Sequence, residues 1–177
     1  RLALFLWSAL PDDPLLTAAD QGLLTTDEQL TQQIHRLLQH PRAASLGTSF
    51  GLQWLGLDQL PRAQKDLTVY PAFSPQIAAL LQHEAALLVS TVLRHDRPLE
   101  ELLSAEYVWV NQQLADYYEL ATPAPLTDWQ QLQISDGSRG GLLALGAVMV
   151  ATSTPTRTSP VLRGRWVLDR ILGQRVL

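Results

Sequence analysis

Cysteine is absent from this chain of 177 residues. Its absence excludes disulfides, iron–sulfur clusters, thiolate zinc sites and covalent haem attachment within these residues. Long hydrophobic runs are also missing. The longest apolar stretch covers residues 140–151, which is shorter than the ~20 residues of a membrane-spanning helix. We therefore expect no transmembrane segment and no cofactor or metal bound by this chain.

Complete catalytic motifs are also missing. The chain has no Gly-x-Ser-x-Gly elbow, no phosphate-binding P-loop and no Gly-x-Gly-x-x-Gly fingerprint. His83-Glu84-Ala85-Ala86-Leu87 resembles half of a zinc-protease helix, but Leu87 stands where the second histidine ligand belongs. The other histidines share no ligand spacing. We therefore predict no catalytic residue and no metal ligand, and we lean towards a non-enzymatic role.

A start signal is missing as well. No initiating Met or signal peptide precedes Arg1, and the chain opens inside a helical pattern. We therefore expect a segment of a larger protein, whose compartment the sequence itself does not fix.

Charge is unevenly distributed. Residues 137–177 carry six arginines and one acid, whereas residues 1–136 carry seven basic and sixteen acidic residues. The overall net charge of −4 and the pI near 5.5 argue against nucleic acid binding. A basic end on an acidic body suggests that the two parts face each other, or that the basic end meets an anionic partner.

Helix signals dominate the rest of the sequence. Thr26 has capping-box spacing to Gln29, Asp13 is the expected cap of the preceding helix, and Ser74-Pro75 opens the longest helix, to about Arg94. Helices are also expected over residues 140–151 and from Ser159-Pro160 to Leu172, with at most brief strands at 108–110 and 131–134. The predicted fold is all-α: an irregular bundle of about eight or nine helices with at most a trace of β. We place a helical domain at 1–121, a linker at 122–136 and the beginning of a second domain at 137–177.

Glu84 is the most informative single residue. It falls on the apolar stripe of the 75–94 helix, where a carboxylate is costly to bury unless it is paired. A catalytic acid with a raised pKa is one interpretation. We favour a structural ion pair with an arginine, and the candidates in order are Arg157, Arg163 and Arg139.

The segment from Thr152 to Arg165 is expected to be ordered. Two prolines restrict its backbone, and Ser159 is the expected cap of the last helix. We predict that Arg157 and Arg163 reach carboxylates of residues 1–136, and that Gly164 permits close approach to another helix. The alternative is that these arginines meet the haem propionates of an adjoining domain.

Several motifs resemble a known family, the helical domain of unknown function found in large cytochrome c-containing proteins of the Planctomycete type. They cover nearly the whole chain and are Phe5-Leu6-Trp7-Ser8, Pro11-Asp12-Asp13, Gln53-Trp54-Leu55-Gly56-Leu57, Glu84, Val92-Leu93-Arg94, Asp96-Arg97, Glu101-Leu102-Leu103, Tyr107, Asn111, Leu114-Ala115 and Tyr118. Arg139-Gly140-Gly141-Leu142-Leu143 and Thr154-Pro155-Thr156-Arg157-Thr158-Ser159-Pro160-Val161-Leu162-Arg163-Gly164 look like the start of the adjoining cytochrome c-type domain.

The resemblance implies an exported multidomain protein, periplasmic or at the cell surface, with c-type haem downstream of this chain. Its implied function is a non-catalytic helical scaffold that docks the adjoining haem domain, in electron transfer or oxidative polymer breakdown, with a possible redox partner protein. Two alternatives stay open: an enzyme, either a haem-linked oxidoreductase or a hydrolase using Glu84, and a pure protein or glycan interaction module.

Overall fold

A computed structural model describes residues 1–134 and 137–174 of the chain. Within these residues, ten α-helices and one two-stranded sheet confirm the predicted all-α class with a trace of β. The strands are β1 (Tyr107–Val110) and β2 (Gln130–Gln133). The helices are α1 (Leu2–Trp7), α2 (Asp13–Asp20), α3 (Asp27–Gln39), α4 (Leu52–Leu55), α5 (Pro75–Arg94), α6 (Glu101–Ser104), α7 (Gln112–Tyr117), α8 (Gly141–Ala144), α9 (Gly146–Ala151) and α10 (Pro160–Trp166).

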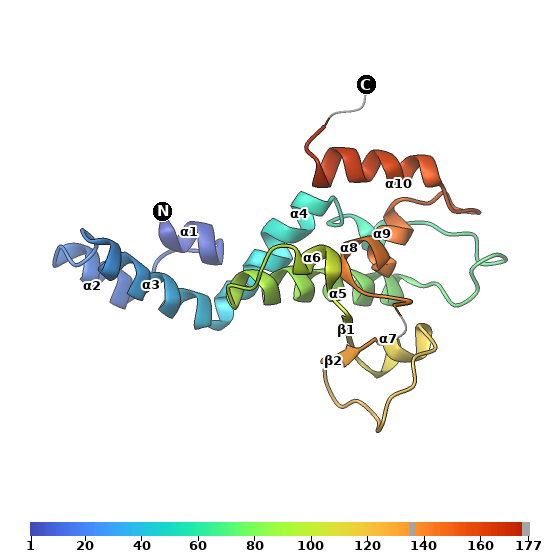
Figure 1. Cartoon of the computed structure of the whole chain (residues 1–177), viewed down its shortest axis with the longest axis horizontal. Coiled ribbons are helices and arrows are strands. Elements are labelled where there is room, and N and C mark those ends of the chain that lie inside the picture. The colour runs from blue at the N-terminus through green and yellow to red at the C-terminus, as the bar shows by residue number, and fades with distance from the viewer. Residues whose placement is uncertain (135–136, 175–177) are drawn as a thin grey trace.

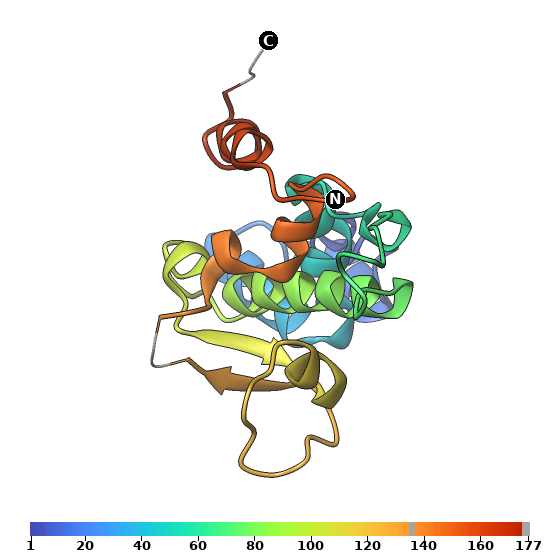
Figure 2. The ribbon, with the colours of Figure 1, turned by 90° about the vertical axis from the view of Figure 1, so that its right-hand side faces the viewer.

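Helix α5 is the centre of the molecule. Ser74 accepts a hydrogen bond from the Ile77 N–H, and Pro75 occupies the first turn, as predicted. Figures 1 and 2 show α5 between α8 and α9 on one side and the small sheet with α7 on the other. By length and composition alone α5 could cross a membrane, but 61% of its most apolar window is buried inside the protein. Such burial is that of a core helix, and the absence of a transmembrane segment stays a prediction.

The buried side chains form two clusters. The smaller cluster joins α1, α2 and α3 to the 3-10 turn Pro41–Ala44, and these helices extend to one side of the body (Figure 1). The larger cluster surrounds α5 and takes side chains from Leu52 to Trp166. It therefore includes residues on both sides of the expected 122–136 linker, of which residues 135–136 lie outside the described part. The domain boundaries at 121 and 137 stay predictions.

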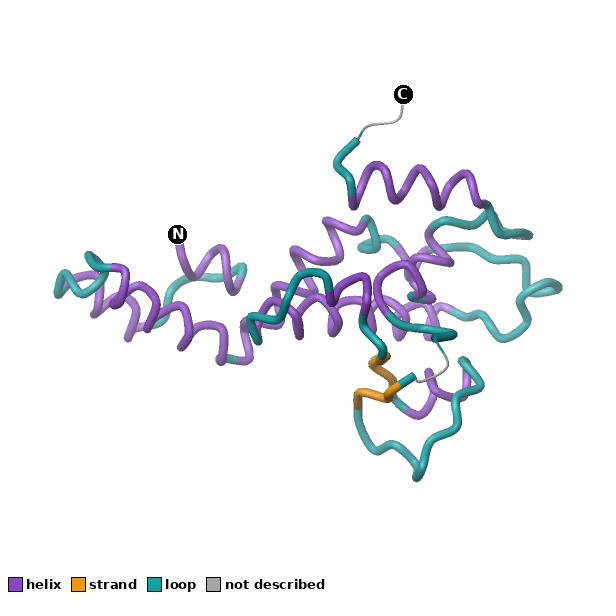
Figure 3. Tube along the Cα trace, in the orientation of Figure 1, coloured by secondary structure: helices purple, strands orange, loops and turns teal. Residues whose placement is uncertain are grey.

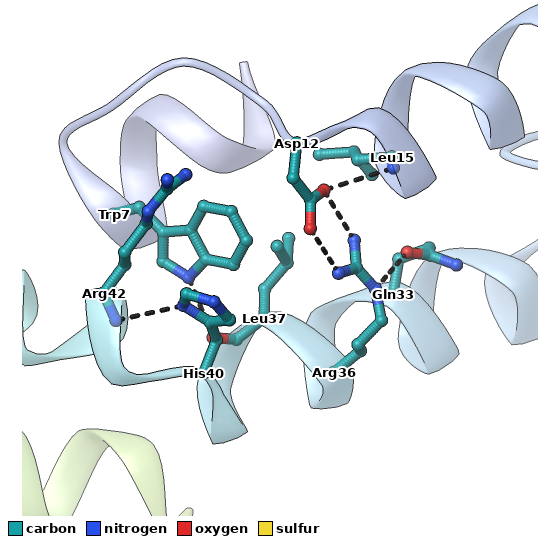
Figure 4. Close-up of polar contacts among 8 residues, drawn as sticks. All are labelled: Trp7, Asp12, Leu15, Gln33, Arg36, Leu37, His40 and Arg42. Carbon is teal, nitrogen blue, oxygen red and sulfur yellow. Dashed lines mark hydrogen bonds and ion pairs between the residues drawn. The ribbon is translucent and has the colours of Figure 1, made fainter.

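Polar contacts fasten the smaller cluster (Figure 4). The Trp7 indole N–H donates to the Leu37 carbonyl at 2.9 Å, and both side chains are buried. Arg36 holds Asp12 with two hydrogen bonds of 2.6 and 3.0 Å. Asp12 also accepts from the Leu15 N–H. Asp12 is thus the cap of α2, one residue before the predicted Asp13, because its extended backbone lets the carboxylate face the free amides of the first turn.

The small sheet connects distant parts of the chain. Strands β1 and β2 are antiparallel, with Val108 opposite Leu132. Asn111 follows β1 and caps α7 through the Leu114 N–H at 2.9 Å. Between α7 and β2 runs a long loop, residues 118–129, and a second long loop precedes α5, at residues 57–74 (Figure 3). The buried Val110 and Leu114 thereby position the end of α7 against α5.

The expected helix over residues 140–151 is two short helices. Leu145 adopts an extended backbone with ψ 134° and separates α8 from α9. Gly140 and Gly141, with φ of 126° and 64°, lead into α8 beside the carbonyls of Ala105 and Leu103. A Cβ atom at either glycine would collide with those carbonyls, and both φ values lie in the region that favours glycine. The glycine pair therefore sets the close packing of α8 on α6.

The segment before α10 is ordered, but its contacts differ from those predicted. The Lys65 ammonium donates to the carbonyls of Val150, Ser153 and Thr154 at 3.1 Å each and to the Ser153 hydroxyl at 2.6 Å. Ser153 also forms a β-bridge with Thr158. A basic side chain of the body thus holds the backbone of this segment, because carbonyl dipoles gathered at one loop attract a cation.

Helix α10 contacts the body through its last residue and through the π-helical turn Val167–Ile171 that follows it. The buried Trp166 indole donates to the Leu55 carbonyl at 2.8 Å, and the Trp54 indole donates to the Arg170 carbonyl at 2.8 Å. Ser159 caps α10 through the Leu162 N–H, as predicted. The expectation for Gly164 is wrong: no atom outside its own helix turn lies within 4 Å of a Cβ built there, because Gly164 is on the exposed side of α10. Figure 2 shows α10 above the rest of the body.

Candidate functional site

The candidate site begins with Glu84 in the middle of α5. Its side chain is fully buried, with only 1% of its surface exposed. Burial raises the pKa of this carboxyl to about 8, although a hydrogen bond from Tyr118 and the charge of Arg139 both act to lower it. At neutral pH the carboxyl is therefore mostly protonated.

Tyr118 is the direct partner of Glu84. Its hydroxyl donates to Oε2 of Glu84 at 2.6 Å and accepts from the Gly146 N–H at 3.2 Å. The three groups come from α5, the end of α7 and the start of α9. Burial, and then the neighbouring Glu84, raise the pKa of the Tyr118 phenol well above its usual value. Oε1 of Glu84 has no hydrogen-bond partner within residues 1–134 and 137–174.

Arg139 completes the group by its contact with the Tyr118 ring. Its guanidinium carbon lies 3.8 Å from the centroid of the Tyr118 ring, which is a cation–π contact. The predicted direct ion pair between Glu84 and an arginine is therefore corrected: in the described part of the chain Tyr118 fills that place, and Arg139 acts on Glu84 by its charge.

The other two predicted arginines lie elsewhere. Arg157 is exposed in the loop before α10, and Arg163 is half-buried on α10. Neither forms an ion pair with a carboxylate of the described residues, and Nε of Arg163 is buried without a partner there. The predicted docking of these two arginines on acidic residues of the body is therefore not found among the described residues, where Lys65 and Trp166 make the contacts with the body instead.

A pocket of about 440 Å³ opens beside this group. Tyr118 and Arg139 line it, whereas Glu84 does not. The remaining lining residues come from the loop before α5, from α5, α7 and α9, and from the segment before α10: Lys65, Val69, Tyr70, Pro71, Ala72, Phe73, Leu81, Tyr117, Gly146, Met149, Val150, Ser153 and Thr158.

The arrangement restricts what Glu84 can do chemically. A general acid must come within hydrogen-bond reach of its substrate, whereas this carboxyl is buried and one of its two oxygens already accepts from the Tyr118 hydroxyl. His83, the neighbour in the incomplete zinc motif, packs on Trp129 instead, with the two ring centroids 4.7 Å apart. No group of three or more metal-ligating side chains gathers in the portion that the structure describes, and the absence of a metal or cofactor stays a prediction.

Sequence reasoning missed the role of Tyr118 and the pocket. Glu84 could be singled out because it interrupts an apolar stripe, which is a local pattern. Tyr118 meets it only because β1 and α7 turn back onto α5, over a separation of 34 residues. No local pattern in the sequence around Tyr118 indicates that contact.

Comparison with known proteins identifies the family. Residues 1–120 match the family described as PSD4, Protein of unknown function (DUF1592). Residues 139–177 match a second family, PSCyt3, Protein of unknown function (DUF1588), whose name is that of a Planctomycete cytochrome family. No curated protein and no solved structure matches the chain. The chain belongs to the DUF1592 family, a Planctomycete-type, cytochrome-associated family of unknown function.

Proposed function

We propose that this chain is a non-catalytic helical scaffold that holds the cytochrome-associated segment 139–177 in a fixed position. In this proposal the segment is the start of a cytochrome c-type domain, and the parent protein carries c-type haem beyond it. The parent is then exported to the periplasm or the cell surface and takes part in electron transfer or oxidative polymer breakdown.

The supporting observation is the way in which the two family segments share one core. Ala147 and Val148 of α9 are completely buried against α5. The Gly146 N–H reaches the Tyr118 hydroxyl, and Trp166 reaches a carbonyl of α4. Side chains from both matched regions thus exclude water together, which fixes the position of the segment better than a flexible linker would.

The surroundings of Glu84 favour a structural role over a catalytic one. The carboxyl is buried and lines none of the four pockets described. Its hydrogen bond to Tyr118 joins helix α5 to α7, and the same hydroxyl joins α7 to α9. A buried polar group with such contacts specifies how the helices meet.

Two variants of the parent protein test the proposal. Glu84→Gln keeps the shape of the side chain and removes its titration, whereas Trp166→Ala removes the anchor of α10. We expect Glu84→Gln to leave the rate of haem reduction by a soluble mediator unchanged, and Trp166→Ala to expose the chain after residue 152 to limited proteolysis. Arg62→Gln, at an exposed position, is the matched control.

Either of two outcomes would contradict the proposed scaffold role. One is a loss of about a hundredfold or more in the activity of the Glu84→Gln parent, which is the range of general acid catalysis. The other is a Trp166→Ala parent as resistant to protease as the unaltered one.

A further inference from the structure

The pocket beside Tyr118 is positively charged although the chain as a whole is acidic. Two basic side chains, Lys65 and Arg139, line it, and among the described residues no aspartate or glutamate does. The net charge of the chain is −4. The positive charge is therefore a local property of this pocket.

The two basic groups are engaged differently. The Lys65 ammonium has its N–H groups directed at three carbonyls and the Ser153 hydroxyl. Its donors are used, while its positive charge is retained and acts on the pocket at a distance. Burial lowers the pKa of this ammonium, and no ion pair between Lys65 and a carboxylate forms among the described residues.

Arg139 keeps its donors. The guanidinium carbon lies 3.8 Å from the centroid of the Tyr118 ring, and this contact uses none of the five N–H donors of the group. Within residues 1–134 and 137–174 the guanidinium forms no ion pair. An arginine guanidinium binds a carboxylate with two parallel hydrogen bonds, and contact with an aromatic ring helps to hold the guanidinium in place.

The rest of the pocket is suited to an apolar ring. Tyr70, Phe73, Tyr117, Met149 and Val150 contribute aromatic and aliphatic walls. The volume of about 440 Å³ lies within the range of small-molecule pockets. We propose that this pocket binds a small aromatic carboxylate, with Arg139 holding the carboxylate and the aromatic walls holding the ring.

A titration with four small molecules tests the site in the whole chain. Benzoate has the ring and the charge, benzamide has the ring without the charge, acetate has the carboxylate without the ring, and inorganic phosphate is an anion of other shape. Binding is measured by calorimetry and by chemical shift changes at neutral pH. We expect saturable one-to-one binding of benzoate, at least about tenfold tighter than that of the other three.

Variants assign the binding to Arg139. Arg139→Gln removes the charge, and we expect it to weaken benzoate binding by about tenfold or more. Arg139→Lys keeps the charge but loses the paired N–H donors of the guanidinium, and we expect an intermediate affinity for benzoate. Arg62→Gln, outside the pocket, is expected to bind as the unaltered chain does, and circular dichroism confirms that each variant is folded.

Three results would overturn the proposal. The first is benzoate binding that does not saturate, and the second is equal affinity for benzoate and benzamide. The third is a folded Arg139→Gln variant with unchanged affinity. If Arg139→Gln does not fold, the Arg139→Lys variant decides the question. A benzoate affinity of Arg139→Lys equal to that of the unaltered chain would contradict the role of the paired guanidinium donors.

Discussion

Replacing Glu84 by Gln is expected to change how stability depends on pH. In the folded chain the pKa of Glu84 is about 8, against 4.5 for an ordinary glutamate. Between these values the folded state holds a proton that the unfolded chain has released. The free energy of unfolding therefore falls as pH rises through this window, and the fall levels off above about pH 8.

The size of the effect follows from the linkage relation. Each pH unit inside the window lowers the free energy of unfolding by about 1.4 kcal/mol. Between about pH 5.5 and about pH 8 the contribution of Glu84 is therefore on the order of 3 kcal/mol, a large part of the stability of a domain of this size. The neighbouring groups do not compensate, because the raised pKa of Tyr118 keeps the phenol neutral over this range.

Urea unfolding of the unaltered chain and of Glu84→Gln at a series of pH values measures the effect. Other titrating groups contribute equally to both proteins, so the difference between their free energies of unfolding isolates Glu84. As pH rises from about 5.5 to about 8, we expect the free energy of unfolding of Glu84→Gln to increase by about 3 kcal/mol relative to that of the unaltered chain. A difference that stays constant with pH would show that the carboxyl is ionised in the folded chain, and would refute the reasoning.

Three further predictions concern contacts within the fold. Gly146→Ala places a methyl group 2.5 Å from the Tyr118 hydroxyl and should cost about 1–3 kcal/mol in thermal unfolding, whereas Gly164→Ala, which meets nothing within 4 Å, should be neutral or stabilising by up to about 1 kcal/mol. Trp166→Phe removes the indole N–H from a buried carbonyl of α4 and should lower the free energy of urea unfolding by about 1–3 kcal/mol; an unchanged value would mean that α10 is not anchored there. Asp12→Asn breaks an ion pair whose partners are 34% and 23% exposed and should cost only about 1 kcal/mol at neutral pH. Because its arginine partner lowers the pKa of Asp12, that contribution should vanish as pH falls through the lowered pKa, and a cost that persists in acid would contradict it.

Local signals predicted the helix starts well. Thr26, Ser74 and Ser159 all accept a hydrogen bond from an amide of the first turn. These caps depend on residues only three positions apart, so the sequence contains the whole interaction. The start of α5 (Pro75–Arg94) after its cap Ser74 was predictable for the same reason.

Breaks inside helices and contacts between them were not predictable in the same way. The apolar run at residues 140–151 is consistent with one helix, but packing on α6 and α5 requires an extended residue at Leu145. Charge asymmetry indicated that the basic end meets the body, yet Lys65 and Trp166 make that contact through backbone carbonyls. Backbone acceptors carry no signal in the sequence, because every residue has one.

Hydrogen exchange on the intact chain tests the central claim that both family segments belong to one core. If α8 and α9 are part of the same cooperative unit as α5, the amides of Val148 and Val89 should exchange with the same free energy of opening, close to that of global unfolding. Trp166→Ala should leave this agreement intact and loosen only α10. A free energy of opening much lower for the Val148 amide than for the Val89 amide would contradict the account. The cytochrome-associated segment would then open independently of the helical scaffold around α5.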